Sequence, residues 1–166
     1  MSGALWYERE VATHLGVVVS NRSAVEDWLD RVTRGLCNGV SGDAVKILRS
    51  SNLELTTGLD YNVHVVRGEG LHDHFTTEDV EVSVKGGLAG KVLAVPPLEL
   101  APLLRWSVTD EILRAMDLES IVVMHNPAFG LRLSVERRHG LHMVAYDTDP
   151  LHTWQPRTGF AYVSVD

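Results

Sequence analysis

The side chains best suited to chemistry lie in one short segment. His72, His74 and Glu78 follow the spacing His-x-His-x3-Glu, and Asp73 lies between the two histidines. Because side chains alternate along an extended segment, His72 and His74 would project from the same face, and Glu78 could return to them after a short turn. Two imidazoles and one carboxylate are enough ligands for a divalent transition metal (Zn, Fe, Mn or Ni) with open positions. Asp73 is an auxiliary candidate, and His125, which follows an apolar run, could supply a third imidazole.

This spacing resembles the first sequence motif of the cupin family, and Gly90–Pro96 lies roughly where cupins begin their second motif. The resemblance implies a metal-dependent enzyme or a metal-binding protein. It covers under a fifth of the chain and departs from the family pattern at three positions. Val66 replaces the glycine of the first motif, Leu98 replaces a glycine of the second, and Ala101 stands where cupins have a histidine ligand.

The same segment also has the features of a solvated polar loop. Gly68 and Gly70 precede it and Thr76-Thr77 follow it, and these residue types form turns and helix caps. No nucleophile elbow, phosphate-binding loop or His-Glu-x-x-His motif occurs in the chain. We therefore expect a binding domain first, and a metal site at His72, His74 and Glu78 as the alternative.

A second group of candidate residues surrounds the long polar segment Asp147–Thr158. Tyr146, Trp154 and Arg157 are residue types that dominate binding energy at protein interfaces. About a dozen residues without a strand or helix pattern are uncommon between two strands unless the loop is used or disordered. The sequence predicts an exposed partner-binding loop that carries Tyr146, Trp154 and Arg157.

The apolar periodicity predicts the elements that position these residues. A short β-branched run at 15–19 indicates a buried strand, and apolar spacings of three and four predict helices at 23–36 and from Ser41. Alternating residues predict strands at 61–65 and 80–84, with Gly86-Gly87 as a hairpin turn to a strand at Lys91–Val95.

The second half of the chain is predicted to be mostly sheet after one interrupted helical segment. Pro102 cannot lie cheaply inside a helix, so this segment should begin near it or divide, with Thr109 capping a second piece. Strands are expected at 121–124 and 160–165, with a hairpin over 131–146. The whole pattern predicts an α+β fold, mainly an antiparallel sheet with two or three helices packed on one face.

Composition limits the classes of function. The 15 Lys and Arg against 22 Asp and Glu give a formal charge of −7, which disfavours nucleic-acid binding. The length of 166 residues and the lack of a linker predict a single α+β domain over residues 1–166. No long apolar stretch predicts membrane insertion, and one cysteine, Cys37, suits a reducing compartment, so we expect a cytoplasmic protein.

Together these patterns favour a small soluble binding, adaptor or regulatory domain that acts through protein–protein contacts. No cofactor is expected unless the histidine segment holds a metal. Because an unpaired sheet edge promotes association, the expected partner is another protein or a second copy of the chain in a homodimer.

Overall fold

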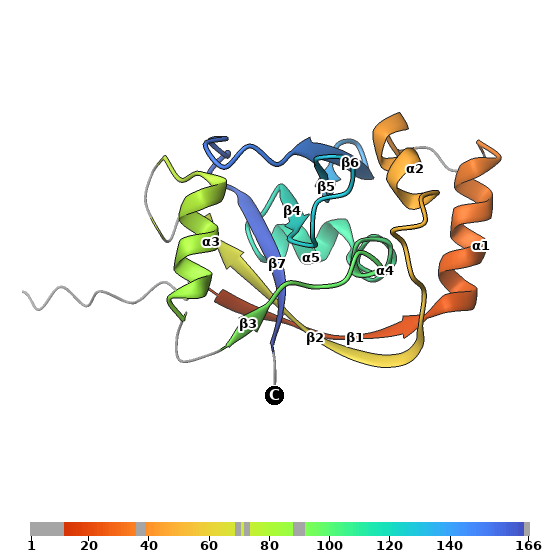
Figure 1. Cartoon of the computed structure of the whole chain (residues 1–166), viewed down its shortest axis with the longest axis horizontal. Coiled ribbons are helices and arrows are strands. Elements are labelled where there is room, and N and C mark those ends of the chain that lie inside the picture. The colour runs from red at the N-terminus through yellow and green to blue at the C-terminus, as the bar shows by residue number, and fades with distance from the viewer. Residues whose placement is uncertain (1–11, 36–38, 69–70, 72–73, 88–91, 165–166) are drawn as a thin grey trace, which may run out of the picture.

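The computed structural model describes residues 12–35, 39–68, 71, 74–87 and 92–164. The strands are β1 (Ala12–Asn21), β2 (Thr57–Arg67), β3 (Leu93–Ala94), β4 (Ser120–Val123), β5 (Leu131–Arg137), β6 (Leu141–Asp147) and β7 (Thr158–Ser164). The helices are α1 (Arg22–Thr33), α2 (Gly42–Leu48), α3 (Thr77–Lys85), α4 (Leu100–Ser107) and α5 (Asp110–Ala115). Figure 1 shows one twisted sheet running through the molecule between α3 on one side and α1, α2 and α4 on the other.

All strands join one sheet in the order β1-β2-β7-β4-β5-β6, and β3 pairs with β7. The neighbours are antiparallel except β4 and β7, which run parallel. This arrangement confirms the predicted α+β class with a mainly antiparallel sheet. After β4 the chain forms the β5–β6 hairpin on one side of β4 and returns as β7 on its other side. The hairpin therefore forms one border of the sheet, and β1 forms the opposite border.

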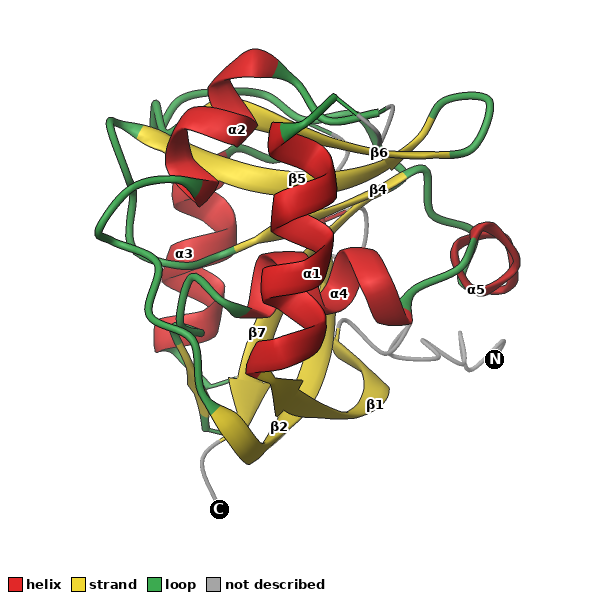
Figure 2. Cartoon of the chain, turned by 90° about the vertical axis from the view of Figure 1, so that its right-hand side faces the viewer, coloured by secondary structure: helices red, strands yellow, loops and turns green. Residues whose placement is uncertain are grey.

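The larger apolar core lies between the sheet and the helical layer formed by α1, α2, α4 and α5, which Figure 2 views from the side of α1. The helix starts are capped as the sequence predicts: the Ser41 side chain accepts from the Ala44 N–H at 3.2 Å. Pro102 lies in the first turn of α4, where a missing N–H is tolerated, and Thr109 caps the separate α5. The predicted division of this segment is confirmed.

The segment with alternating valines is a helix, so the predicted strand at 80–84 is wrong. The Thr76 side chain accepts from the Asp79 N–H at 3.2 Å and the Asp79 carboxylate accepts from the Thr76 N–H at 2.7 Å, which makes a capping box at the start of α3. Val80 is buried, Val84 packs against the same cluster one turn later, and Val82 is 62% exposed. Valines at every second position thus also place two of three on one helix face.

The glycine pair that was predicted to form a hairpin turn ends α3 instead. The Gly86 N–H donates to the Val82 carbonyl at 3.0 Å, and Gly87 adopts φ +80°, a backbone conformation that favours glycine. Within the described part of the predicted strand Lys91–Val95, only β3 forms, and it pairs with β7. The two glycines therefore mark the end of α3, which covers the face of the sheet opposite the larger apolar core.

The second face of the sheet carries a smaller apolar cluster, which α3 and the loop between β6 and β7 cover. Phe75, Val80, Trp154, Phe160 and Tyr162 belong to this cluster. The helices thus cover both faces, whereas the sequence placed them on one. No helix in the described ranges is long and apolar enough to cross a membrane.

Candidate functional site

A pocket of about 390 Å³ opens on the second face of the sheet, where β5 and β6 meet the loop 148–157. Its size lies within the range of small-ligand and side-chain pockets, about 300–1,000 Å³. The residues that line it are Glu119, Ser120, Glu136, Arg137, Arg138, Tyr146, His152, Thr153, Trp154, Gln155 and Thr158. The pocket thus combines a carboxylate, aromatic rings and arginines.

Glu136 is the buried acid of this pocket. It lies near the end of β5 and is only 6% exposed. Its Oε1 accepts a hydrogen bond from the Tyr146 hydroxyl, and its Oε2 accepts from Arg138 Nε at 2.7 Å. The Arg138 side chain is itself 59% exposed. A buried carboxylate therefore has one fixed neutral donor and one cationic donor that reaches in from solvent.

Burial raises the pKa of Glu136 above its ordinary value, while the nearby charges of Arg138 and His142 oppose that shift. Burial disfavours the charged form of a carboxyl because the surrounding protein solvates it less well than water does. The Arg138 guanidinium compensates for part of the lost hydration. A cation at this position is accordingly what the ionised Glu136 requires.

Aromatic rings form the wall of the pocket beside Glu136. The Trp154 ring meets Tyr146 at a centroid distance of 5.1 Å and His152 at 4.4 Å, both edge-to-face. Behind them Trp154 packs on Phe160 at 5.5 Å. The Trp154 indole N–H donates to the Thr77 hydroxyl at 2.9 Å, so its orientation is fixed from the α3 side.

The prediction that Trp154 is exposed is wrong, because only 8% of its surface is accessible to solvent. The loop 148–157 is tied to the start of α3: the Thr77 N–H donates to the His152 carbonyl at 3.2 Å and the Glu78 N–H to the Pro150 carbonyl at 2.9 Å. These carbonyls satisfy N–H groups that the first turn of a helix leaves free. The loop is therefore a fixed cover of the second face, with an exposed outer side.

The other two residues predicted to bind a partner occupy different environments. Tyr146 is half-buried in the pocket, whereas Arg157 is exposed. Arg157 lies 3.6 Å from an Asp117 oxygen and 3.9 Å from a Glu119 oxygen, and Glu119 lines the pocket. The structure thus brings Tyr146 and Trp154 together in the pocket wall and places Arg157 at its margin.

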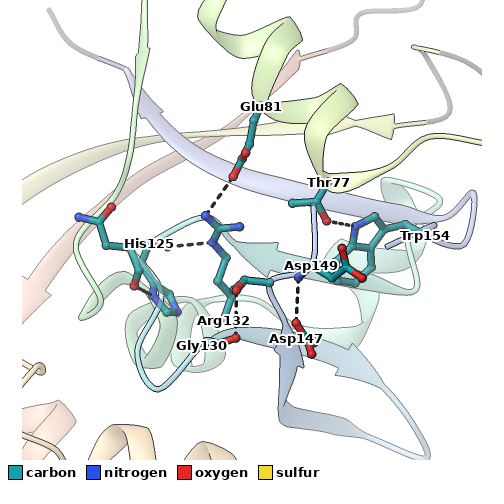
Figure 3. Close-up of polar contacts among 10 residues, drawn as sticks. Thr77, Glu81, His125, Gly130, Arg132, Asp147, Asp149 and Trp154 are labelled. Carbon is teal, nitrogen blue, oxygen red and sulfur yellow. Dashed lines mark hydrogen bonds and ion pairs between the residues drawn. The ribbon is translucent and has the colours of Figure 1, made fainter. Parts of the chain in front are cut away.

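A second ion pair on the same face joins Arg132 of β5 to Glu81 of α3. Figure 3 shows the Arg132 side chain between His125 and Glu81. Arg132 donates to the His125 carbonyl at 3.0 Å and to a Glu81 carboxylate oxygen at 3.1 Å. The Arg132 side chain is only 13% exposed, which makes this pair a link between α3 and the sheet.

His125, the auxiliary metal candidate, has both ring nitrogens engaged. Nε2 accepts from the Leu133 N–H at 3.0 Å, which leaves the hydrogen on Nδ1 to donate to the Asn126 carbonyl at 2.6 Å. Burial lowers the pKa of His125 to about 4, so the ring is neutral near pH 7. His125 would have to break a buried hydrogen bond to bind a metal.

The other metal candidates are only partly placed. His72 and Asp73 lie outside the described residues, while His74 and Glu78 are exposed. Glu78 lies in the first turn of α3, not after a turn between two strands. Among the described residues, no three His, Cys, Asp or Glu side chains lie close enough to hold a metal ion. The metal site at His72, His74 and Glu78 stays a prediction.

Glu136 is not among the residues that the sequence predicts to be functional, because the alternation of polar and apolar residues in the predicted hairpin 131–146 is typical of a strand with one solvated face. Ser134 and Glu136 alternate with Leu133 and Val135, but all four are buried. The signal that could have revealed this burial is the long loop that follows the hairpin, since a tryptophan in such a loop needs a surface to pack against.

Comparisons of the chain with protein-family models, with curated proteins and with solved structures find no match.

Proposed function

We propose that this protein is a binding domain that recognises a partner protein by taking one of its basic side chains into the Glu136 pocket. The observation that carries this proposal is the pairing of a 6%-exposed carboxylate with a 59%-exposed arginine in the same pocket. Glu136 already accepts a guanidinium from Arg138. That guanidinium belongs to a side chain that can swing into solvent.

The chemistry of the pocket favours a guanidinium over other groups. A carboxylate pairs with the planar guanidinium through charge-assisted hydrogen bonds, which are stronger than bonds between neutral groups. The rings of Tyr146, His152 and Trp154 stand beside that carboxylate, and aromatic rings attract cations by their electron-rich faces. An ammonium would find the same charge but a poorer geometric fit.

Arg138 acts as the resident occupant that an incoming arginine replaces. An ion pair to an exposed side chain contributes only about 0–1 kcal/mol. The exchange keeps Glu136 paired, so no buried charge is left alone. Displacing Arg138 is therefore a small cost for a partner that adds its own contacts around the pocket.

The charge of the surroundings supports a basic partner. The chain carries a net charge of −7, which favours encounter with positively charged segments. Two arginines at the pocket are already neutralised, because Arg137 donates to Asp110 at 2.7 Å and Arg157 lies near Asp117 and Glu119. These ion pairs leave the carboxylate of Glu136 as the group that an incoming cation meets.

Calorimetric titration with a capped Gly-Arg-Gly tripeptide tests this function. We expect binding to the wild type, and none of comparable strength for the citrulline tripeptide, which has the same shape without the charge. Glu136→Gln should weaken binding at least about two-fold, because the incoming charged hydrogen bond contributes about 1.5–3 kcal/mol and the Arg138 pair that it replaces contributes about 0–1 kcal/mol. Arg138→Gln should strengthen it by up to about five-fold, since it removes the competitor.

Matched controls lie on α1 and at the cap of its C-terminal end, on the opposite face of the sheet. Glu26 and Arg34 each form an exposed ion pair there, and Glu26→Gln and Arg34→Gln should leave binding unchanged. Equal binding of the citrulline peptide, or unchanged binding to Glu136→Gln, would refute the proposed function.

A further inference from the structure

The two borders of the sheet differ in how their backbone is covered. On the β6 border the Ser41 N–H donates to the Met143 carbonyl at 2.9 Å, and the Met143 N–H donates to the Gly39 carbonyl at 2.7 Å. On the other border β1 pairs with β2, and no described residue pairs with its outer side. Figure 2 shows β1 and β2 at the lower end of the molecule. Within the part of the chain that the structure describes, one long border is thus left without a strand partner.

The composition of β1 does nothing to prevent such pairing. Its residues, ATHLGVVVSN, include no Asp, Glu, Lys, Arg or Pro, the residue types with which proteins usually protect an exposed edge. Val17 is 55% exposed and Val19 is 53% exposed. The only irregularities are register shifts near Leu15 and Ser20, which leave Gly16–Val19 as a regular stretch.

We propose that β1 pairs antiparallel with β1 of a second copy of this chain, so that two sheets join into one across a two-fold axis at Val18. In such a pair, residues opposite each other point to the same face. One residue must therefore lie opposite its own copy across the axis, and the axis cannot fall midway between two successive positions of the strand. An axis at Val18 places Val17 opposite Val19 of the second copy, and Val19 opposite its Val17. Valines opposite each other in this way stabilise antiparallel pairs.

A second copy fits this edge because the three consecutive valines at 17–19 are complementary to themselves in an antiparallel pair about Val18. Two-fold symmetry sets each group near its own equivalent, so any charged side chain at the axis would face a like charge. Two copies that each carry a net charge of −7 repel, and pairing along a strip without acidic residues keeps like charges away from the axis. β1 is such a strip over all ten of its residues.

The register at Val18 also agrees with the geometry of the strand itself. It sets Gly16 opposite Ser20 of the second copy, so the irregularities near Leu15 and Ser20 bound the regular pairing on both sides of the valine run. The side chains of Val17 and Val19, which water surrounds in the single chain, become covered. The β1 border is separate from the Glu136 pocket, which lies toward the other border on β5 and β6.

Sedimentation velocity of the full chain over a wide concentration range tests the proposal. We expect the wild type to reach twice the chain mass of 18.4 kDa. Val17→Glu combined with Val19→Glu should stay at the single-chain mass, because four carboxylates would meet at the axis. Val82→Glu is the matched control: Val82 is a 62%-exposed valine on α3, and this variant should dimerise as the wild type does.

Charge complementation separates lost pairing from lost folding. The double-lysine variant, Val17→Lys with Val19→Lys, should also be monomeric, but a mixture with the double-glutamate variant should form the mixed dimer in native mass spectrometry. Restored dimers require both variants to be folded and require position 17 to face position 19. A monomeric wild type, a dimeric double-glutamate variant, a monomeric Val82→Glu or a mixture without dimers would each overturn the proposal.

Discussion

Two buried glutamates of this protein illustrate different uses of a carboxylate. Glu99 is 2% exposed at the start of α4, and Glu136 is 6% exposed at the end of β5. Glu99 accepts from the Thr56 N–H at 2.8 Å, from the Thr56 hydroxyl at 2.5 Å and from the Tyr61 hydroxyl. Glu136 accepts from the Tyr146 hydroxyl and from the exposed Arg138.

The difference lies in the donors and not in the burial. The donors to Glu99 are neutral groups held by the backbone and by β2, so its carboxylate links the segment before β2 to α4. One donor to Glu136 is the Arg138 guanidinium, which belongs to a long, exposed side chain at the pocket. Burial of an acid alone therefore does not indicate a binding site, whereas a buried acid with an exchangeable cationic partner does.

Among the substitutions that test this difference, Glu99→Ala should have the largest effect on the free energy of unfolding. Glu99→Ala leaves the Thr56 N–H and the hydroxyls of Thr56 and Tyr61 without their acceptor. An unpaired buried donor costs about 1–3 kcal/mol; because these three contacts are only part-buried and the two hydroxyls can turn toward water, we expect a total loss of about 2–4 kcal/mol in the free energy of unfolding. Urea denaturation measures it, and a loss below about 1 kcal/mol would show that Glu99 does not tie these elements together.

His125 gives a second effect on stability, and this effect depends on pH. Its pKa of about 4 lies below its ordinary 6.5, so the unfolded chain binds the proton first as pH falls. Stability should be full above about pH 6.5 and decline as pH falls towards about 4, with a loss of about 2 kcal/mol between pH 7 and pH 5.

Comparing the wild type with His125→Gln isolates this contribution, because other acids titrate in both proteins. The difference in unfolding free energy between the two should shrink as pH falls from 7 to 5. A difference that stays constant over this range would mean that His125 titrates normally in the folded protein.

The smallest expected effect is on stability at Glu136. Burial raises the pKa of Glu136, so its folded form favours the protonated state, and its contribution to stability is lost as pH rises through that raised pKa. Near pH 7 the ionised group contributes little, and Glu136→Gln should change the free energy of unfolding by less than about 1 kcal/mol. A loss as large as that of Glu99→Ala would make Glu136 a structural residue too.

The sequence predicted the elements whose signals are local. The β5–β6 hairpin and the division of α4 from α5 at Pro102 follow from alternation and from proline geometry. The α3 segment was misassigned because valines at 80, 82 and 84 fit a strand and an α-helix face alike. The decisive signals were its capping box and its terminal glycine, both of which the strand assignment left unused.

The candidate site was predicted only in part, for a physical reason. Tyr146 and Trp154 were identified by residue type, but Glu136 lies in the same pocket only because the fold brings β5 and the loop 148–157 together. This proximity depends on contacts between distant residues, as where Trp154 meets Thr77. The alternation of polar and apolar residues within β5 gives no sign of these long-range contacts.

The most direct test of the account is an NMR titration that follows the Glu136 carboxyl carbon and the Arg138 Nε–H in one sample. As the capped Gly-Arg-Gly peptide is added, both signals should shift together with one dissociation constant, because the peptide replaces Arg138 at Glu136. The binding should weaken as pH falls through the raised pKa of Glu136, since protonation removes the charge. A peptide that binds while the Arg138 signal stays in place, or a Glu136 signal that does not move, would contradict the account.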